Sequence, residues 1–147
     1  MKKFIPRLLA ILFLTISIGS CEKDAPPAPA PSIVGKWTPI KTDIKNSSGV
    51  TISQPYTENV VGCDKNYTEF VNGGLIKDVE YSKINNVCTP DIDTLLWELT
   101  GNNLKFTDGQ YVNNFTVETL TQTDLVVKII ETTGGVTTTI TLYFSRI

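Results

Sequence analysis

The chain carries few side chains that could do chemistry: three cysteines, at positions 21, 63 and 88, and no histidine. Cys63 and Cys88 could hold a metal, act as a nucleophilic thiol or form a disulfide. Zinc sites usually have four Cys or His ligands, and thiol catalysis usually needs a neighbouring base, most often histidine. The lack of histidine argues against both, so no metal site and no catalytic thiol are expected.

Asp91 and Asp93 are the remaining candidate pair. Alternate residues of an extended segment share a face, so the two carboxylates could bind calcium weakly or do acid–base work on a glycoside. A solvated loop after Cys88 is the simpler interpretation. The sequence has no Gly-x-Ser-x-Gly elbow and no phosphate-binding glycine loop. We therefore expect no enzyme activity and no cofactor.

The N-terminus has the layout of a secretory signal peptide. Lys2, Lys3 and Arg7 precede an apolar run over residues 8–18, followed by the small pair Gly19-Ser20. A membrane-spanning helix is the alternative, but this run of about 11 residues is shorter than the roughly 20 that a bilayer requires. Export would deliver Cys63 and Cys88 to a compartment where disulfides form, so we predict a Cys63–Cys88 bond.

Ile18-Gly19-Ser20-Cys21 resembles the lipobox of bacterial lipoproteins. The resemblance implies that residues 1–20 are removed and that Cys21 is acylated with chains such as palmitate; cleavage that leaves a free thiol is the alternative. Residues 21–32 contain four prolines and would form an extended tether. We expect an outer-membrane protein held by its lipid, on the periplasmic face or on the cell surface.

Removing residues 1–20 from the 147 leaves 127, a suitable length for one domain over residues 33–147. The leader takes three of the 13 basic residues and none of the 15 acidic ones, which leaves a net charge of 10 − 15 = −5. Such a chain is a poor partner for nucleic acid. The same charge argues that only the lipid contacts the membrane, and we expect a monomer.

From Ser32 onward, β-branched and aromatic residues alternate with polar ones, and Gly or Asn separates the runs. Val136, Ile140, Leu142 and Phe144 share one face of the last run, with threonines on the other. Such hairpins lose their exposed edges by closing on themselves. The pattern predicts an all-β, antiparallel up-and-down barrel of about eight strands, near residues 35–44, 67–71, 75–81, 95–100, 103–107, 111–120, 124–131 and 136–147.

Gly35-Lys36-Trp37 in the first run resembles the Gly-x-Trp signature of lipocalins, and more closely its variant in small lipocalin-like lipoproteins of Bacteroidetes. Cys63-Asp64-Lys65 before an aromatic-ending strand, and the later Cys88, fit the same variant. The resemblance implies that Trp37 closes the barrel floor under a basic side chain of the last strand, for which Arg146 is the candidate. The chain departs from the family in ending at Ile147 without a C-terminal helix.

An eight-stranded barrel can hold one small ligand or be filled by its own side chains. We expect a small apolar or amphipathic ligand in the barrel. The alternative is an envelope interaction module with a filled barrel, whose loops at residues 45–54 and 85–93 dock a protein or glycan. The candidate lining residues are the inward aromatic and aliphatic side chains Trp97, Phe106, Tyr111, Phe115, Leu125, Val127, Ile140 and Phe144.

Overall fold

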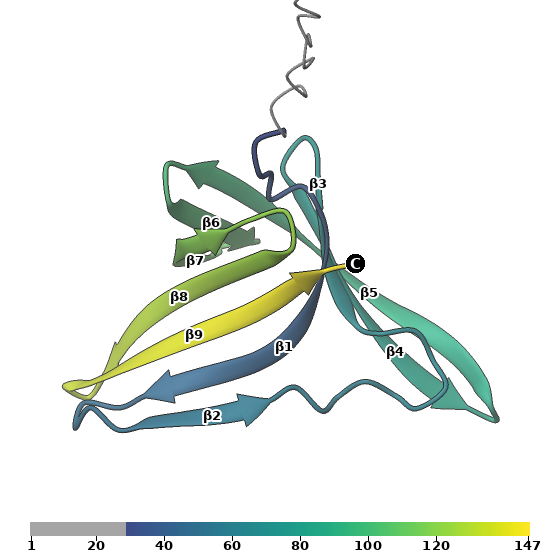
Figure 1. Cartoon of the computed structure of the whole chain (residues 1–147), viewed down its shortest axis with the longest axis horizontal. Helices are drawn as coiled ribbons and strands as arrows, with labels where there is room; N and C mark the ends of the chain where they lie inside the picture. Colours follow the sequence, from purple (N-terminus) through teal and green to yellow (C-terminus); the bar gives the residue numbers. More distant parts are fainter. Residues whose placement is uncertain (1–28) are drawn as a thin grey trace, which may run out of the picture.

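The computed structural model describes residues 29–147 (Figure 1). The predicted signal peptide, Cys21 and most of the predicted tether lie outside the described residues. The described part contains nine β-strands and no helix. The strands are β1 (Gly35–Lys45), β2 (Thr51–Pro55), β3 (Tyr67–Val71), β4 (Leu75–Ile84), β5 (Val87–Thr100), β6 (Asn103–Asp108), β7 (Tyr111–Leu120), β8 (Asp124–Thr133) and β9 (Val136–Arg146).

Strand pairing closes the sheet into a ring. Every pair is antiparallel, and β1 joins β9 along one edge from Trp37 to Lys45. The other edge of β1 pairs first with β3, at residues 35–37, and then with β2, at residues 41–45. Eight strands therefore complete the ring, while β2 lies beside the far half of β1. The predicted all-β antiparallel barrel of about eight strands is confirmed.

Two segments that were predicted as polar loops are strands instead. β2 lies largely within the predicted loop at 45–54, and β5 begins at Val87 rather than at residue 95. Proline and aspartate disfavour strands, which hid the first half of β5. Pro90 is tolerated there because this half pairs only with β4, and β6 first joins at Leu96. Asn85 and Asn86 form the intervening turn with φ of 51° and 63°, which asparagine accepts.

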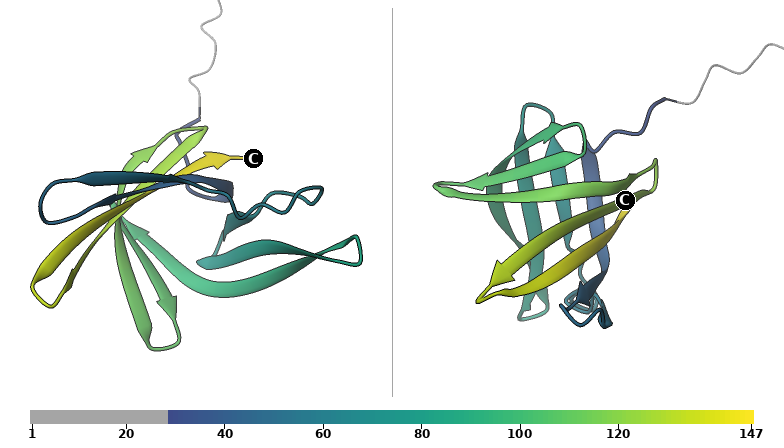
Figure 2. Two further views of the ribbon diagram at one scale, coloured as in Figure 1. Left: turned by 90° about the horizontal axis from the view of Figure 1, so that it is seen from below. Right: turned by 90° about the vertical axis from the view of Figure 1, so that its left-hand side faces the viewer.

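The two ends of the barrel differ. We call the closed end the one that holds residues 29–34, Ile147 and the turns at 72–74, 101–102 and 121–123. The open end holds the tips of the β1–β2, β4–β5, β6–β7 and β8–β9 hairpins. Figure 1 and Figure 2 show the β4–β5 hairpin pointing away from β8–β9, whereas β1–β2 stays beside β8–β9. The barrel therefore widens toward the open end on the side of β4–β5, while β1 and β9 stay paired from Trp37 to Lys45.

The hydrophobic core lies at the closed end. Trp37 and Leu104 are fully buried, and Ile76, Leu125 and Val127 are at most 3% exposed. Strand pairing shows the inner face directly for Leu104. It lies opposite Leu99 of β5 and Phe115 of β7, which both pack against the core. Aromatic rings extend the core toward the middle of the barrel, where Phe70 meets Trp97 edge-on at 5.5 Å between ring centroids.

Candidate functional site

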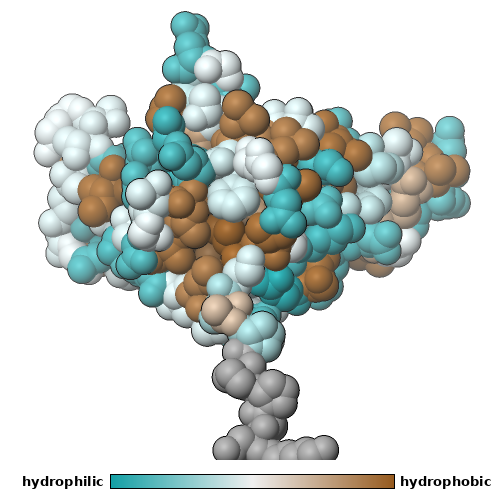
Figure 3. Space-filling model, turned by 90° about the horizontal axis from the view of Figure 1, so that it is seen from above, coloured by the Kyte–Doolittle hydropathy of each residue, from teal (hydrophilic) through white to brown (hydrophobic). Residues whose placement is uncertain are grey.

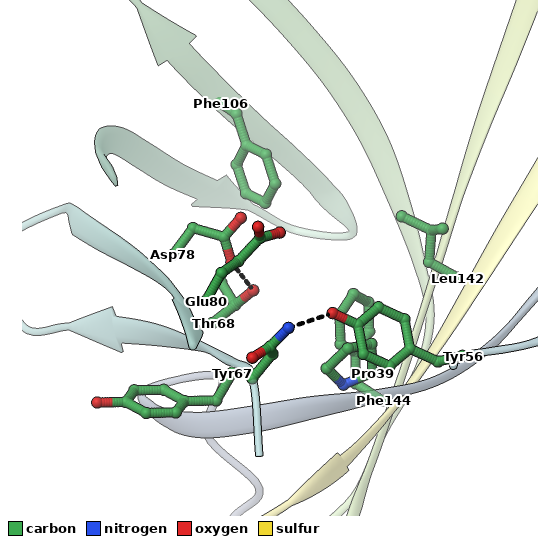
Figure 4. Close-up of a pocket in the computed structure, with 10 residues that line it drawn as sticks. Pro39, Tyr56, Tyr67, Thr68, Asp78, Glu80, Phe106, Leu142 and Phe144 are labelled. Carbon is green, nitrogen blue, oxygen red and sulfur yellow. Dashed lines mark hydrogen bonds between the residues drawn. The ribbon is translucent and has the colours of Figure 1, made fainter. Parts of the chain in front are cut away.

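A cavity of about 250 Å³ lies inside the barrel, between the core and the open end (Figure 4). Its apolar wall comes from the last strand, the first strand and β6. Pro39 pairs with Phe144 across β1 and β9, and Leu142 lies two residues away on the same face. Phe106 of β6 completes this wall, with its ring 6.0 Å from that of Phe70 in the core.

The opposite wall of the cavity is polar and acidic. Thr68 of β3 lies across from Asp78 of β4, and its hydroxyl donates a hydrogen bond to Asp78 Oδ1 at 2.9 Å. Glu80 follows two residues later and lines the same cavity. Figure 4 shows the two carboxylates side by side, below the ring of Phe106. This wall can accept hydrogen bonds and attract a positive charge.

Asn66 holds the segment at residues 56–66 beside this polar wall through hydrogen bonds. Its side chain donates to the Tyr56 hydroxyl at 2.8 Å and accepts from the Tyr81 backbone N–H at 2.8 Å. Its backbone carbonyl accepts from the Thr38 hydroxyl at 2.9 Å. Asn66 is only 4% exposed, so its polar atoms are buried with their hydrogen bonds made.

Tyr56 brings a phenol to the cavity. Burial raises the pKa of Tyr56, the hydrogen bond from Asn66 lowers it, and the carboxylates of Glu58, Glu80 and Asp78 raise it further. The hydroxyl therefore stays protonated near neutral pH and, while accepting from Asn66, keeps its own proton to donate. The phenol of Tyr67 instead points away from the other residues in Figure 4, and its oxygen accepts from Lys36 Nζ at 3.3 Å on the outside of the barrel.

A disulfide ties the 56–66 segment to the β4–β5 hairpin. Cys63 and Cys88 are bonded, with their Cα atoms 5.6 Å apart. The predicted disulfide is confirmed. Lys83 of the same hairpin donates to the Val61 carbonyl at 3.3 Å. Together with Asn66, these contacts hold the segment against β4, next to the acidic wall of the cavity.

Trp37 and Arg146 meet at the closed end. The Arg146 guanidinium lies 4.3 Å from the Trp37 ring centroid, and the indole N–H donates to the Ile33 carbonyl at 2.7 Å. Arg146 also donates to the backbone carbonyls of Val34, at 3.0 Å, and Ser32. Gly35 permits this close approach, since a Cβ there would lie 2.5 Å from Arg146 Nη1.

The candidate lining residues divide among several environments. Phe106 and Phe144 line the cavity. Leu125 and Val127 are buried in the core, and Trp97 and Phe115 pack against it. Ile140 is partly exposed on β9, and Tyr111 is 71% exposed at the tip of the β6–β7 hairpin.

Sequence reasoning missed the polar half of the cavity. Thr68, Asp78 and Glu80 alternate with outward residues in the same register as the core residues Phe70 and Ile76. That alternation was visible in the sequence. Only apolar residues were expected in the lining, however, so the polar residues on the same face were omitted. Tyr56 and Asn66 had no such signal, because they lie outside the strands that form the ring.

The described residues offer no other chemical centre. Between residues 29 and 147, no three Cys, Asp, Glu or His side chains are placed to hold a metal ion. Asp91 and Asp93, predicted to lie in a loop, are paired residues of β5 that face Glu80 and Asp78 of β4. The same stretch of chain contains no helix long and apolar enough to cross a membrane.

No protein-family model and no curated protein matches the sequence. Solved structures to which it is similar include a dog lipocalin allergen, at 18% identity and a TM-score of 0.41, over 78% of this chain and 74% of that one. Aphrodisin, a sex pheromone from the female hamster, gives the same four values. A complex of bovine odorant-binding protein with undecanal is 17% identical, with a TM-score of 0.41, over 77% of this chain and 70% of that one. The closed barrel of this chain follows from its own strand pairing.

Proposed function

We propose that this chain is a lipid-anchored protein of the bacterial outer membrane whose barrel binds a small apolar or amphipathic ligand. The observation that carries the proposal is the cavity of about 250 Å³ between the core and the open end. It combines an apolar wall of Leu142, Phe144 and Phe106 with a few polar groups on the opposite side. Ligand sites commonly have this composition, since apolar walls supply affinity and a few polar groups fix orientation.

The proposed activity is binding without catalysis. The sequence has no histidine to serve as a general base. Both cysteines of the described region are in the disulfide, so neither supplies a free thiol beside the carboxylates of the acidic wall. The groups that face the cavity can therefore hold a ligand by packing, hydrogen bonding and charge.

Native mass spectrometry tests ligand binding directly. The chain from Glu22 onward, which keeps every described residue, would be exported behind a cleavable leader in its native host and purified gently from the soluble fraction of the envelope. We expect a small molecule that is retained in the native spectrum and lost on denaturation. Leu142→Trp should abolish its retention by filling the cavity, whereas Tyr143→Trp should not, because Tyr143 lies on the outer face beside Lys41. Equal retention by both variants would contradict binding in this cavity.

The lipid anchor is tested separately, at Cys21. We expect the full chain to partition into the membrane fraction with an acylated Cys21, and Cys21→Ala to release it into the soluble fraction. Protease treatment of intact cells distinguishes the cell surface from the periplasmic face. A wild-type chain that is soluble and carries no acyl group would overturn this part of the proposal.

A second candidate function is docking through the tip of the β4–β5 hairpin. Ile84 and Val87 pair across the hairpin and are 66% and 63% exposed, and Val61, on the segment joined to it by the disulfide, is 91% exposed. Figure 3 shows apolar residues on the arm at the right, where Figure 1 places this hairpin. Apolar side chains gathered at a tip favour contact with a partner. A native mass spectrum in which neither the wild-type chain nor Leu142→Trp retains a small molecule would favour this function.

A further inference from the structure

The inner face of the β4–β5 hairpin carries four carboxylates in two cross-strand pairs. Asp78 lies opposite Asp93, and Glu80 lies opposite Asp91. Residues directly opposite each other in an antiparallel pair share a face, and like charges in such pairs are destabilising. The hairpin therefore carries concentrated negative charge on the side that faces the cavity.

No basic side chain of the described residues neutralises this charge. The three salt bridges of the described chain join Lys41 to Asp43, Lys77 to Glu69 and Lys128 to Glu118, and none reaches the four carboxylates. The cavity is lined by two of the carboxylates and by no lysine or arginine. The cavity therefore carries net negative charge on its polar wall. Burial is the largest cause of the raised pKa of Tyr56, and Glu58, Glu80 and Asp78 add to it against the hydrogen bond from Asn66.

Aromatic rings face these carboxylates across the cavity. Phe106 lies above Asp78 and Glu80 in Figure 4, and Phe144 and Tyr56 line the same space. A cation over an aromatic face is attracted by the ring quadrupole, and aromatic sites that bind quaternary ammonium ligands use this attraction. Carboxylates on one side and aromatic rings on the other are complementary to an organic cation with an apolar tail.

We propose that the ligand of this barrel is a cationic amphiphile, with an amine or quaternary ammonium head held by Asp78 and Glu80 and a short apolar tail against Leu142 and Phe144. This inference rests on the proposed ligand-binding function and narrows it by charge. Fatty acids and other anionic amphiphiles are rejected, because their carboxylate would enter the same negative potential. A bare metal ion is not the ligand, since no three carboxylates of the described chain converge on one point.

Isothermal titration of the chain from Glu22 onward with three probes of equal chain length tests the inference. The probes are octyltrimethylammonium, octanol and octanoate. We expect the cation to bind at least about tenfold more tightly than octanoate, with octanol between them. The preference for the cation should decrease as salt is raised, because these carboxylates are solvent-exposed and screened.

A charge-neutral, nearly isosteric variant assigns the effect to the cavity. Asp78→Asn/Glu80→Gln should weaken binding of octyltrimethylammonium about tenfold and change octanol binding less than about twofold. The matched control is Glu69→Gln/Glu98→Gln, which removes two carboxylates from the outer faces of β3 and β5 and should leave all three affinities unchanged. Circular dichroism of each variant verifies the fold.

The possible results distinguish a failure of the cationic inference from a failure of the proposed ligand-binding function. If the three probes bind equally and Leu142→Trp blocks all of them, the cavity binds ligands without charge selection, and the cationic inference fails while the proposed function stands. If none of the probes binds, both fail. If the control variant weakens the cation as much as the cavity variant does, the effect is one of net charge and the inference is overturned.

Discussion

The closed and open ends of this barrel are built from the same strands but perform different tasks. At the closed end the inner positions of β1, β3, β4, β6 and β8 carry Trp37, Phe70, Ile76, Leu104 and Leu125, all at most 3% exposed. A few residues further along β4, the inner positions are Asp78 and Glu80, which are exposed to solvent. One strand thus passes from a packed core into the wall of a cavity within four residues.

The difference shows how a small barrel combines stability with binding. Large apolar side chains fill the closed end, and burial of each contributes about 1.5 to 3 kcal/mol. The open end contributes less burial, so its segment at 56–66 is fixed instead by the disulfide and by Asn66. Changes at the closed end should therefore alter stability, whereas changes in the cavity should alter binding first.

The largest expected effect is from Trp37→Ala at the closed end. Trp37 is fully buried, packs under Arg146 and donates to the Ile33 carbonyl. Its truncation should lower the free energy of unfolding by about 3 to 5 kcal/mol. Urea denaturation measures the loss, and Tyr111→Ala, at a residue that is 71% exposed, should change stability by less than about 0.5 kcal/mol. Similar losses for the two variants would contradict the division of the barrel into two ends.

Loss of the disulfide should be the next largest effect, and it should act at the open end. Cys63→Ser/Cys88→Ser opens a loop whose ends are separated by 25 residues in sequence, which corresponds to about 3 kcal/mol in the chain-entropy model. Thermal unfolding with and without a reductant measures it: the reductant should destabilise the wild-type chain but not the variant. Amide hydrogen exchange should increase in residues 56–66 while the core strands stay protected.

Gly35→Ala should produce an intermediate loss at the closed end. Gly35 has φ of +134°, and a Cβ there would lie 2.5 Å from Arg146 Nη1. Backbone strain and displacement of the guanidinium should together cost about 1 to 3 kcal/mol. Denaturation gives the value, and Gly134→Ala serves as a comparison, because it has positive φ but nothing within 4 Å of the added Cβ. A larger loss at Gly134 would show that contact with Arg146 is not what makes Gly35 necessary.

Tyr56→Phe should have the smallest effect on stability and a clearer effect on the open end. It removes the hydroxyl that accepts the hydrogen bond from Asn66, so the free energy of unfolding should fall by about 0.5 to 1.5 kcal/mol. Exchange of the Tyr81 amide, which donates to the same Asn66 side chain, should become faster. An unchanged exchange rate would mean that Asn66 holds its position without Tyr56.

Much of the strand order was readable from the sequence. Alternation of apolar and polar residues located β7 and β9, and the Gly and Asn residues between the runs marked turns such as those at 73–74 and 134–135. The first half of β5 was not readable, because Pro90, Asp91 and Asp93 are unfavourable in a strand. Pairing with β4 overrides that preference. Only the apolar wall of the cavity was predictable. Phe106 and Phe144 followed from apolar alternation, whereas Asp78 and Glu80 were not expected in the lining because they are charged.

By itself, the sequence determined the antiparallel all-β class, the closure into about eight strands and the pairing of Cys63 with Cys88. These properties depend on local alternation, on turn residues and on the two cysteines within residues 33–147, all of which can be read along the chain without its tertiary contacts. Only the tertiary structure decided which half of the barrel is filled. That outcome depends on how far the hairpins diverge, and so on which inner side chains meet across the barrel: Trp37 and Leu104 meet other large apolar groups, whereas Asp78 and Glu80 face open space.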